Sequence, residues 1–248
     1  MKVSIITACF NSAETIASTI ASVKSQDFPD IEHIIIDGNS SDSTLEIIQH
    51  SGANCVIHSE KDNGIYDAMN KGIILSTGDI VGILNSDDFY ANSSIISKVV
   101  ELFKQKNCDA VYGDLVYVDA NDTNRVTRKW ISGNFSKQKF LYGWMPPHPT
   151  FFVKKEVYLK YGLFNLNVYT AADYELMLRL LFKFNIKVAY LQEILVKMRA
   201  GGASNISLKN RFLANKGDRM AWKINNLKPF WFTLVFKPLR KILQFIYK

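Results

Sequence analysis

The chain has 248 residues, of which 48% are hydrophobic and 21% are charged. These values are typical of a folded globular protein that buries a sizeable core, as one large domain or two small ones. The formal charge of +7 is uneven, because residues 209–248 hold ten Lys or Arg and a single acid while the remaining residues carry a slight negative charge. A near-neutral body argues against a nucleic-acid groove, so we expect no nucleic-acid partner.

The cysteines and the N-terminus bear on location. Cys9, Cys55 and Cys108 are far apart and sit in apolar segments, which indicates small core residues in a reducing compartment. The first residues lead directly into an apolar strand without a signal-peptide pattern. No apolar run reaches the ~18 residues of a spanning helix. We therefore expect a cytoplasmic protein.

The first 106 residues alternate between predicted strands and predicted helices. The strands are Val3–Cys9, Ile31–Ile36, Ala53–His58 and Asp79–Leu84, and the helices are one that opens at Ser12, then Thr44–His50, Ile65–Leu75 and Ser93–Lys106. Strand and helix joined by short loops predict an α/β fold in which a mostly parallel, Rossmann-like sheet is flanked by helices.

A polar cluster follows each predicted strand: Thr7–Asn11, Asp37–Asp42, Asp62–Asp67 and Asn85–Asp88. In parallel sheets, ligands bind at the carboxyl ends of the strands. Asp87 and Asp88 at the end of a buried strand are costly unless a cation, such as Mg²⁺ or Mn²⁺ carrying a phosphate, lies beside them. The alternative is that Asn85–Asp88 form only a turn and a helix cap. Neither a G-x-G-x-x-G nor a G-x-x-x-x-G-K-[ST] motif is present.

The second half has a different pattern. Ala110–Val118 and Arg125–Ile131 predict two antiparallel strands, and shorter strands are predicted at Thr150–Val153 and Lys187–Tyr190. Between them, residues 143–149 form a Pro-rich loop that we expect to expose its aromatic and imidazole side chains. A helix is expected from Ala171, where Asp173 is either a helix cap or a functional carboxylate. Residues 199–204 predict a mobile, glycine-rich loop.

Four of these motifs, in this order, resemble those of family 2 glycosyltransferases with the GT-A fold. They are Val3–Asn11, Ile36–Asp42, Gly64–Ile73 and Leu84–Asp88, and the resemblance covers about residues 1–205. It is closest to bacterial enzymes that build O-antigen, capsule or exopolysaccharide. The departures from the family pattern are Ala8, Phe10, Met69, Asn85 in place of the first acid of the D-x-D motif, and Ala172 in place of the Glu of the Glu-Asp motif.

The resemblance implies a role for particular residues. Asp87 would be the main ligand of a weakly held Mn²⁺ or Mg²⁺, and Asp173 would be the catalytic base. His148 would orient the acceptor or the pyrophosphate, or would be a loop imidazole exposed to water. The residues implied for nucleotide-sugar binding are Thr7, Ala8, Asn11, Glu14, Asp37, Asp67, Asn70, Lys71 and Ser86.

The implied reaction is inverting transfer of a sugar from a nucleotide-sugar donor, expected to be a UDP sugar, to a lipid-linked saccharide acceptor. It needs a metal at the leaving group, a base at the acceptor hydroxyl and correct placement, and no enzymatic nucleophile. Two other functions stay open. One is a sugar-phosphate nucleotidyltransferase, although residues 7–11 lack the expected glycines. The other is a non-catalytic nucleotide-sugar-binding or scaffold protein.

The expected organisation is a GT-A domain at 1–205, with a nucleotide-sugar half at 1–106 and an acceptor half with a small antiparallel sheet at 107–205, followed by a basic amphipathic tail at 206–248. Leu239, Ile242, Leu243 and Ile246 fall on one helical face. Pro229 and Pro238 predict two short helical pieces in place of one. We expect the tail to make peripheral contact with the inner face of the cell membrane. The alternative is that it packs on the body or at a dimer interface.

Overall fold

The computed structural model describes residues 1–201 and 208–246, and within these it leaves out the side chains of residues 169, 208–214, 241–243 and 245–246. Residues 202–204, half of the predicted glycine-rich loop, therefore lie outside the described residues. So do the side chains of Ile242, Leu243 and Ile246, and with them most of the predicted apolar face of the tail.

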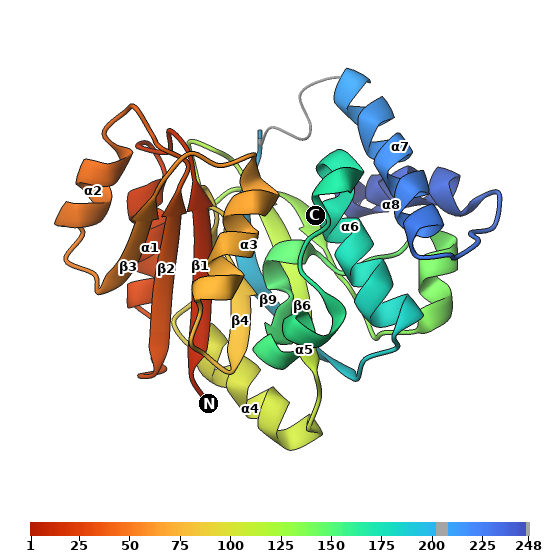
Figure 1. The fold of residues 1–248 in the computed structure, drawn as a ribbon, viewed down its shortest axis with the longest axis horizontal. Coiled ribbons are helices and arrows are strands. Elements are labelled where there is room, and N and C mark those ends of the chain that lie inside the picture. The colour runs from red at the N-terminus through yellow and green to blue at the C-terminus, as the bar shows by residue number, and fades with distance from the viewer. Residues whose placement is uncertain (202–207, 247–248) are drawn as a thin grey trace.

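The described residues form one nine-stranded sheet in the order β3-β2-β1-β4-β8-β6-β9-β5, with β7 paired to β6 (Figure 1). Its parallel part consists of β1 (Val3–Cys9), β2 (Ile31–Asp37), β3 (Cys55–Ser59) and β4 (Ile80–Ile83). The other strands are β5 (Phe89–Tyr90), β6 (Ala110–Val118), β7 (Val126–Trp130), β8 (Phe152–Lys154) and β9 (Val188–Arg199). The α/β prediction is confirmed. The antiparallel pair β6–β7 belongs to the same sheet, because β8 joins β4 to β6.

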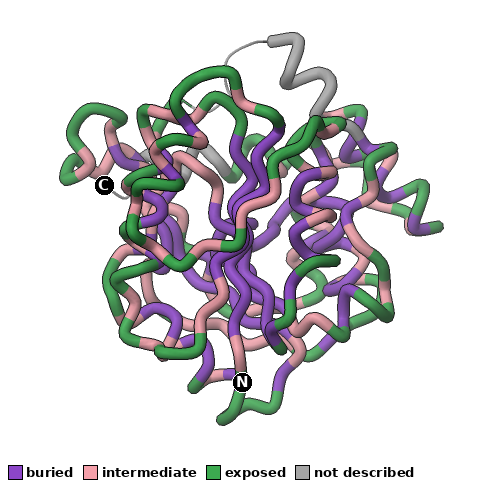
Figure 2. Tube along the Cα trace, turned by 60° about the vertical axis from the view of Figure 1, so that its left-hand side comes forward, coloured by how far each residue is buried: buried purple, intermediate pink, exposed green. Residues whose placement is uncertain are grey.

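The strands of the first half are mostly apolar because both faces of the sheet are covered. Ile6 of β1 packs in a cluster with Ala68 and Ile73 of α3 (Ile65–Leu75), while its neighbour Ile5 packs in another cluster with Val99 of α4 (Ile95–Lys106). Successive side chains of a strand point to opposite faces, so apolar residues are needed on both, and the buried polar residues Thr7 and His33 contact each other at 3.0 Å. Figure 2 shows the result as a column of buried strands in the centre of the molecule.

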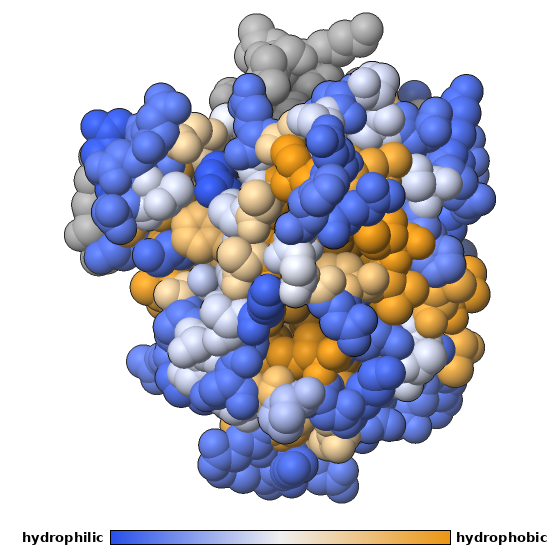
Figure 3. All heavy atoms as spheres, turned by 90° about the vertical axis from the view of Figure 1, so that its left-hand side faces the viewer, coloured by the Kyte–Doolittle hydropathy of each residue, from blue (hydrophilic) through white to orange (hydrophobic). Residues whose placement is uncertain are grey.

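The remaining helices complete the layers. They are α1 (Ile16–Lys24), α2 (Thr44–His50), η1 (Lys137–Tyr142), η2 (His148–Thr150), α5 (Lys155–Tyr161), η3 (Leu166–Ala171), α6 (Ala172–Met177), η4 (Leu178–Lys183), α7 (Leu208–Ile224) and α8 (Thr233–Ile246). α1 and α2 cover the β3 side of the sheet with a cluster of Ile16, Ile20, Ile35 and Ile48. Figure 3 views the molecule from this side, and most of the surface there is hydrophilic.

Three predictions about the second half need correction. β9 runs on to Arg199, nine residues beyond the predicted end, because it pairs along β6 and then with β5. The predicted strand 150–153 starts two residues late, since η2 occupies His148–Thr150. The loop 143–149 is buried, because Trp144 donates a hydrogen bond to the Ser132 carbonyl at 2.9 Å and its ring packs edge-on against Phe140.

The C-terminal segment packs on the body, which is one of the two alternatives that the sequence left open. Trp222 of α7 lies in the main core cluster, and α8 contacts β7 and η1. The approach of α8 is close, because a Cβ on Gly143 would lie 2.4 Å from the backbone nitrogen of Lys237. Pro238 lies inside α8, so the prediction of a break there is wrong; the helix tolerates the loss of one backbone hydrogen bond. No helix in the described part of the chain is long and apolar enough to cross a membrane.

Candidate active site

The loops that follow β1 and β2 are tied together at the carboxyl edge of the sheet. The backbone nitrogen of Asn11 donates to Ser40 Oγ at 2.8 Å, and Asn11 Oδ1 accepts from the backbone nitrogen of Ser41 at 2.9 Å. Asn11 has a φ of 49°, a left-handed conformation that asparagine adopts more readily than most residues. The predicted site residue Asn11 therefore shapes the junction between two of the four polar loops.

Asp37 is the buried anchor of the second loop. Its carboxylate accepts hydrogen bonds from the Ser40 backbone nitrogen at 3.1 Å and from Ser59 Oγ at 2.7 Å, and also from the Ser40 hydroxyl. The residue has no exposed surface. Asp37 thus orders the loop after β2, and its implied contact with a uracil base stays a prediction.

The other predicted residues of the β1 region differ in accessibility. Thr7 is fully buried and its hydroxyl lies 3.0 Å from His33 Nε2, so its side chain is engaged within the sheet. Ala8 is buried as well, whereas Glu14 is exposed ahead of α1. The role in nucleotide binding implied for these three residues stays a prediction.

The segment 85–88 is fixed between α1 and the β1 loop. Ser86 Oγ lies 2.9 Å from Ser12 Oγ, and Thr19 Oγ1 donates to the carbonyls of Ser86 at 2.9 Å and Asp88 at 2.8 Å. Asn85 Nδ2 donates to Asp88 Oδ2 at 2.8 Å. Asp88 is followed by β5 and then by α4, whose N-terminal flanking residue is Ser94. The carboxylates of 85–88 are therefore not the cap of that helix.

Burial raises the pKa of both Asp87 and Asp88, and for Asp88 the negative charge of Asp87 adds to the effect. Arg199, at the end of β9, opposes both shifts, and its guanidinium donates to the Asp87 carbonyl and, at 3.0 Å, to Ser18 Oγ. Arg199 has a defined place here that the sequence did not indicate. In the sequence, Arg199 is visible only as a cation shortly before Gly201 and Gly202.

The residues present fit a divalent cation held jointly with phosphate oxygens. Asp88 Oδ1 is buried, and no donor in the described part of the chain reaches it with hydrogen-bonding geometry. Two adjacent carboxylates with a surplus of negative charge suit Mg²⁺ or Mn²⁺. Among the described residues, no group of three His, Cys, Asp or Glu side chains could form an all-protein metal cage. Such a site would need ligands from a substrate, as Mg²⁺ sites commonly do.

The three predicted residues of α3 are engaged with their surroundings. Lys71 pairs with Glu60 at 2.8 Å and lies 3.8 Å from Asp67. The side-chain amide of Asn70 exchanges two hydrogen bonds of 2.9 Å with the backbone of Phe164. Asn70 therefore joins α3 to the loop before η3, and the contact with the donor implied for these residues stays a prediction.

Asp173 does not cap its helix. The flanking residue of α6 is Ala171, Asp173 is the second residue of the helix, and its carboxylate accepts a hydrogen bond from the adjacent backbone nitrogen of Tyr174 at 2.7 Å. Tyr66 and His148 are its neighbours. Burial raises the pKa of Tyr66, with the charge of Asp173 adding to the effect. The cap interpretation of Asp173 is therefore not supported, and a partly exposed carboxylate is left available for chemistry.

His148 is buried, so the alternative that it is a loop imidazole exposed to water is wrong. Its ring meets Phe164 edge-on with centroids 5.3 Å apart. Burial lowers the pKa of His148, and the negative charge of Asp173 partly offsets this shift. The imidazole next to the candidate base is therefore neutral at pH 7, as a hydrogen-bonding group that orients another residue or a ligand can be.

The side chain of Tyr117 is close enough to both carboxylate centres to feel their charge. Burial raises the pKa of Tyr117, Arg128 lowers it, and the charges of both Asp88 and Asp173 raise it further. The two carboxylates come from segments 85 residues apart in the sequence. Tyr66 and Tyr117 were missed from the sequence, because aromatic residues in apolar segments look like core residues there.

Comparison with known proteins shows the family and the fold. Residues 4–161 match glycosyl transferase family 2. The chain is 27% identical over 216 residues to a PGL/p-HBAD biosynthesis glycosyltransferase of Mycobacterium tuberculosis (strain ATCC 25177 / H37Ra), covering 85% of this chain and 82% of that protein.

Two solved structures share the fold. The 1–349 fragment of S. aureus TarS in complex with UDP has a TM-score of 0.66 and 17% identity, covering 92% of this chain and 67% of that one. The mannosyltransferase PcManGT from Pyrobaculum calidifontis, in complex with GDP-Man and Mn²⁺, has a TM-score of 0.65 and 16% identity, covering 95% and 68%. The predicted GT-A fold is confirmed, and the match over residues 4–161 establishes that the chain belongs to glycosyl transferase family 2.

Proposed function

We propose that this glycosyltransferase moves a sugar from a UDP sugar to a hydroxyl of a lipid-linked saccharide with inversion, in the assembly of a bacterial surface polysaccharide such as O-antigen or capsule. It would work as a peripheral protein on the inner face of the cell membrane. The observation that carries the proposal is that two carboxylate centres from distant segments both raise the pKa of Tyr117. One is the adjacent pair of half-buried Asp87 and buried Asp88, and the other is Asp173, which does not cap its helix.

Each centre has a separate task in a single displacement. Asp87, with Asp88 behind it, would hold Mn²⁺ or Mg²⁺, which when bound neutralises the diphosphate leaving group. Asp173 would accept the proton of the acceptor hydroxyl as that oxygen attacks the anomeric carbon. The neutral ring of His148 and the hydroxyl of Tyr66 would keep this carboxylate and the acceptor in position. Holding donor and acceptor between the two centres would bring proton transfer and bond formation together.

The test is Asp173→Asn, which keeps the size of the side chain and removes its ability to accept a proton. We expect turnover with a UDP-sugar panel and a lipid-linked acceptor extract to fall about 10²-fold or more. Thermal unfolding and UDP binding should stay close to those of the unmodified enzyme.

A suitable control is Asp79→Asn, which removes an exposed carboxylate directly ahead of β4, at the amino end of the parallel strands. Equal losses in the two variants would mean that Asp173 has no special part in proton transfer. Retention of full turnover by Asp173→Asn would refute its role as the base.

A further inference from the structure

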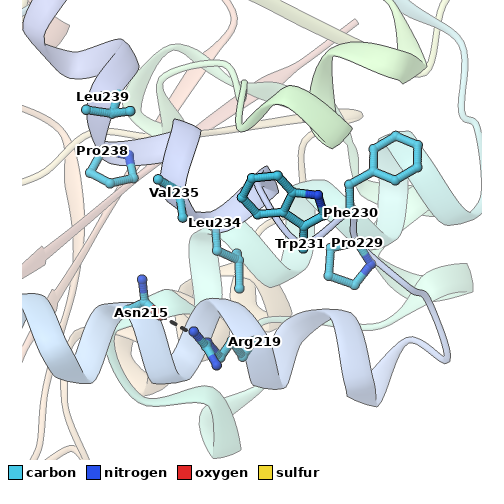
Figure 4. A pocket seen from close by; sticks show the side chains of 9 residues that line it. All are labelled: Asn215, Arg219, Pro229, Phe230, Trp231, Leu234, Val235, Pro238 and Leu239. Atoms are coloured by element: carbon cyan, nitrogen blue, oxygen red, sulfur yellow. Dashed lines mark hydrogen bonds between the residues drawn. The ribbon is translucent and has the colours of Figure 1, made fainter.

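A surface hollow of about 560 Å³ lies between α7 and α8, away from the carboxylates of the site (Figure 4). Asn215 and Arg219 line it from α7, where Arg219 Nε donates to Asn215 Oδ1 at 3.2 Å. The other side of the hollow is apolar and comes from α8 and the loop before it. It consists of Pro229, Phe230, Trp231, Leu234, Val235, Pro238 and Leu239.

The apolar side chains of this hollow are unusually open to solvent. Trp231 is 88% exposed, and Val235, Phe230 and Leu239 are each about half exposed. A gathering of large exposed apolar residues marks an interaction surface, since it gains free energy when it is covered. Tryptophan beside leucine and cations is typical of side chains that lie at a membrane–water boundary.

A second hollow of about 650 Å³ continues the first and shares Arg219 and Pro229 with it. Lys223 and Lys228 also line it, and no acidic residue lines either hollow. Asp218, the acid of this segment, is nearly buried and pairs with Lys237 at 2.5 Å. An apolar hollow therefore adjoins a cationic one, which is the arrangement that complements the two ends of an anionic amphiphile.

We propose that these two hollows are a docking site for the anionic surface of a lipid bilayer. Lipid phosphates lie over Arg219, Lys223 and Lys228, while Trp231 and Leu239 enter the boundary between headgroups and acyl chains. This inference rests on the proposed function in one respect: a lipid-linked acceptor lies in a membrane, so the enzyme must reach the membrane surface.

The docking face is connected rigidly to the candidate base. Trp222 of α7 donates from Nε1 to the hydroxyl of Tyr174 at 2.9 Å, and Lys237 Nζ of α8 lies 3.6 Å from the centroid of the Tyr174 ring. Tyr174 directly follows Asp173 in α6. Docking through α7 and α8 therefore sets the orientation of the catalytic helix relative to the lipid surface.

The experiment measures co-sedimentation of the full chain with sucrose-loaded vesicles. One set is phosphatidylcholine alone, and the other contains phosphatidylglycerol. We expect binding to the anionic set that weakens with salt, since exposed charges are screened. Two variants test the site: Arg219→Gln with Lys223→Gln should weaken binding about 30-fold, because each cation adds about 1 kcal/mol, and Trp231→Ser should weaken it at least tenfold.

Matched controls remove the same groups elsewhere. Lys104→Gln with Lys106→Gln takes two exposed cations from α4, and Leu159→Ser removes an apolar side chain that is 72% exposed on α5. These controls should bind vesicles like the unmodified chain. Equal weakening in controls and site variants, or no binding to anionic vesicles at low salt, would overturn the proposal.

Two further readouts separate the possible outcomes. Concentration-dependent dimerisation that Trp231→Ser abolishes, without vesicle binding, would show that a second copy of this chain covers the hollow and would also overturn the proposal. Release of UDP from UDP sugars without vesicles should be unchanged in Trp231→Ser. Failure of vesicle binding with intact UDP release would thus refute the docking site and leave the reaction untouched.

Discussion

At the scale of single residues, the main feature is that two adjacent carboxyl groups have little contact with solvent. Asp87 and Asp88 are held at the end of a strand whose other residues are apolar, and both have a raised pKa because of burial. Arg199 supplies one positive charge against these two carboxylates. Two carboxylates facing one guanidinium leave excess negative charge, which is tolerated when a proton or a bound cation neutralises it.

The first prediction concerns this compensation. Asp87→Ala should abolish transfer, whereas Asn85→Asp should preserve activity and tighten its dependence on Mn²⁺, because a third carboxylate joins the cluster. Initial rates over a Mn²⁺ titration, with EDTA as the zero point, measure both. Full activity of Asp87→Ala in EDTA would remove the metal from the proposal.

The second prediction concerns His33, whose pKa burial lowers from 6.5 to about 4. Between these two values the unfolded chain binds more protons than the folded one, so stability is lost as the pH falls through this window. The contribution of this residue should be about 2 kcal/mol between pH 7.5 and 5.

The comparison uses His33→Gln, which keeps a hydrogen-bonding group beside Thr7. Urea unfolding at the two pH values should show a smaller loss of stability in the variant than in the unmodified chain. The buried His148 contributes equally to both proteins and cancels. The same pH dependence in both would mean that the pKa of His33 is the same in the folded and the unfolded chain, and would contradict the lowered value.

At the scale of the elements, α3 depends on a close approach to β1. A Cβ at Gly72 would lie 2.4 Å from Ile6 Cγ2, in a strand that cannot move because it pairs on both sides. Alanine normally stabilises a helix relative to glycine by about 1 kcal/mol. Here we expect Gly72→Ala to destabilise the protein by about 1–3 kcal/mol, since overpacking outweighs helix propensity.

A double-mutant cycle checks this explanation. Ile6→Ala removes the atoms that would clash, so the combination with Gly72→Ala should be less destabilised than the sum of the two single changes. Urea midpoints of the four proteins give the coupling free energy. Additive losses would place the strain elsewhere in α3.

The elements also show how far the sequence alone could lead. Apolar runs followed by polar loops predicted β1 to β4 and their helices, because local hydrophobic periodicity carries that information. The two-residue strand β5 pairs with β9 and the long β9 pairs along β6, and no local pattern of Phe89–Tyr90 reveals a partner a hundred residues away. The burial of Trp144 and His148 likewise comes from packing against distant segments, so a Pro-rich loop was mistaken for an exposed one.

The site residues also fall into those that the sequence could predict and those that it could not. Asp87 and Asp173 could be selected from short motifs, and the geometry leaves both available for the proposed chemistry. Arg199 and Tyr117 could not be selected in this way, because their neighbours come from distant segments of the chain. The assignment of Asn70 to the donor could not anticipate that the backbone of Phe164 occupies both ends of its amide.

At the scale of the whole molecule, α8 connects the C-terminal segment to the rest of the chain. A chain ending at Asn226 loses the ion pair of Lys237 with nearly buried Asp218 and the hydrogen bond of 2.6 Å from Thr233 Oγ1 to the Leu141 carbonyl. We expect it to be less stable by about 3 kcal/mol, because breaking a buried pair is costly. Urea unfolding against the full chain measures the difference.

Lys237→Met is the matched variant, since it keeps most of the packing and removes the charge. It should account for a large share of the loss seen in the shortened chain. An unchanged urea midpoint in the shortened chain would show that α8 adds nothing to the stability of the body.

The continuity of the sheet has a consequence for synthesis on the ribosome. β4 meets its second neighbour only when β8 has been made, and β5 has no partner until β9 emerges. At 5–20 residues per second, roughly ten seconds separate the appearance of β4 from that of Arg199. During this interval the nascent donor half presents an unpaired apolar strand edge, the kind of surface that chaperones shield. The two halves of the enzyme are therefore expected to mature together, and a separately expressed donor half should be captured by chaperones or aggregate.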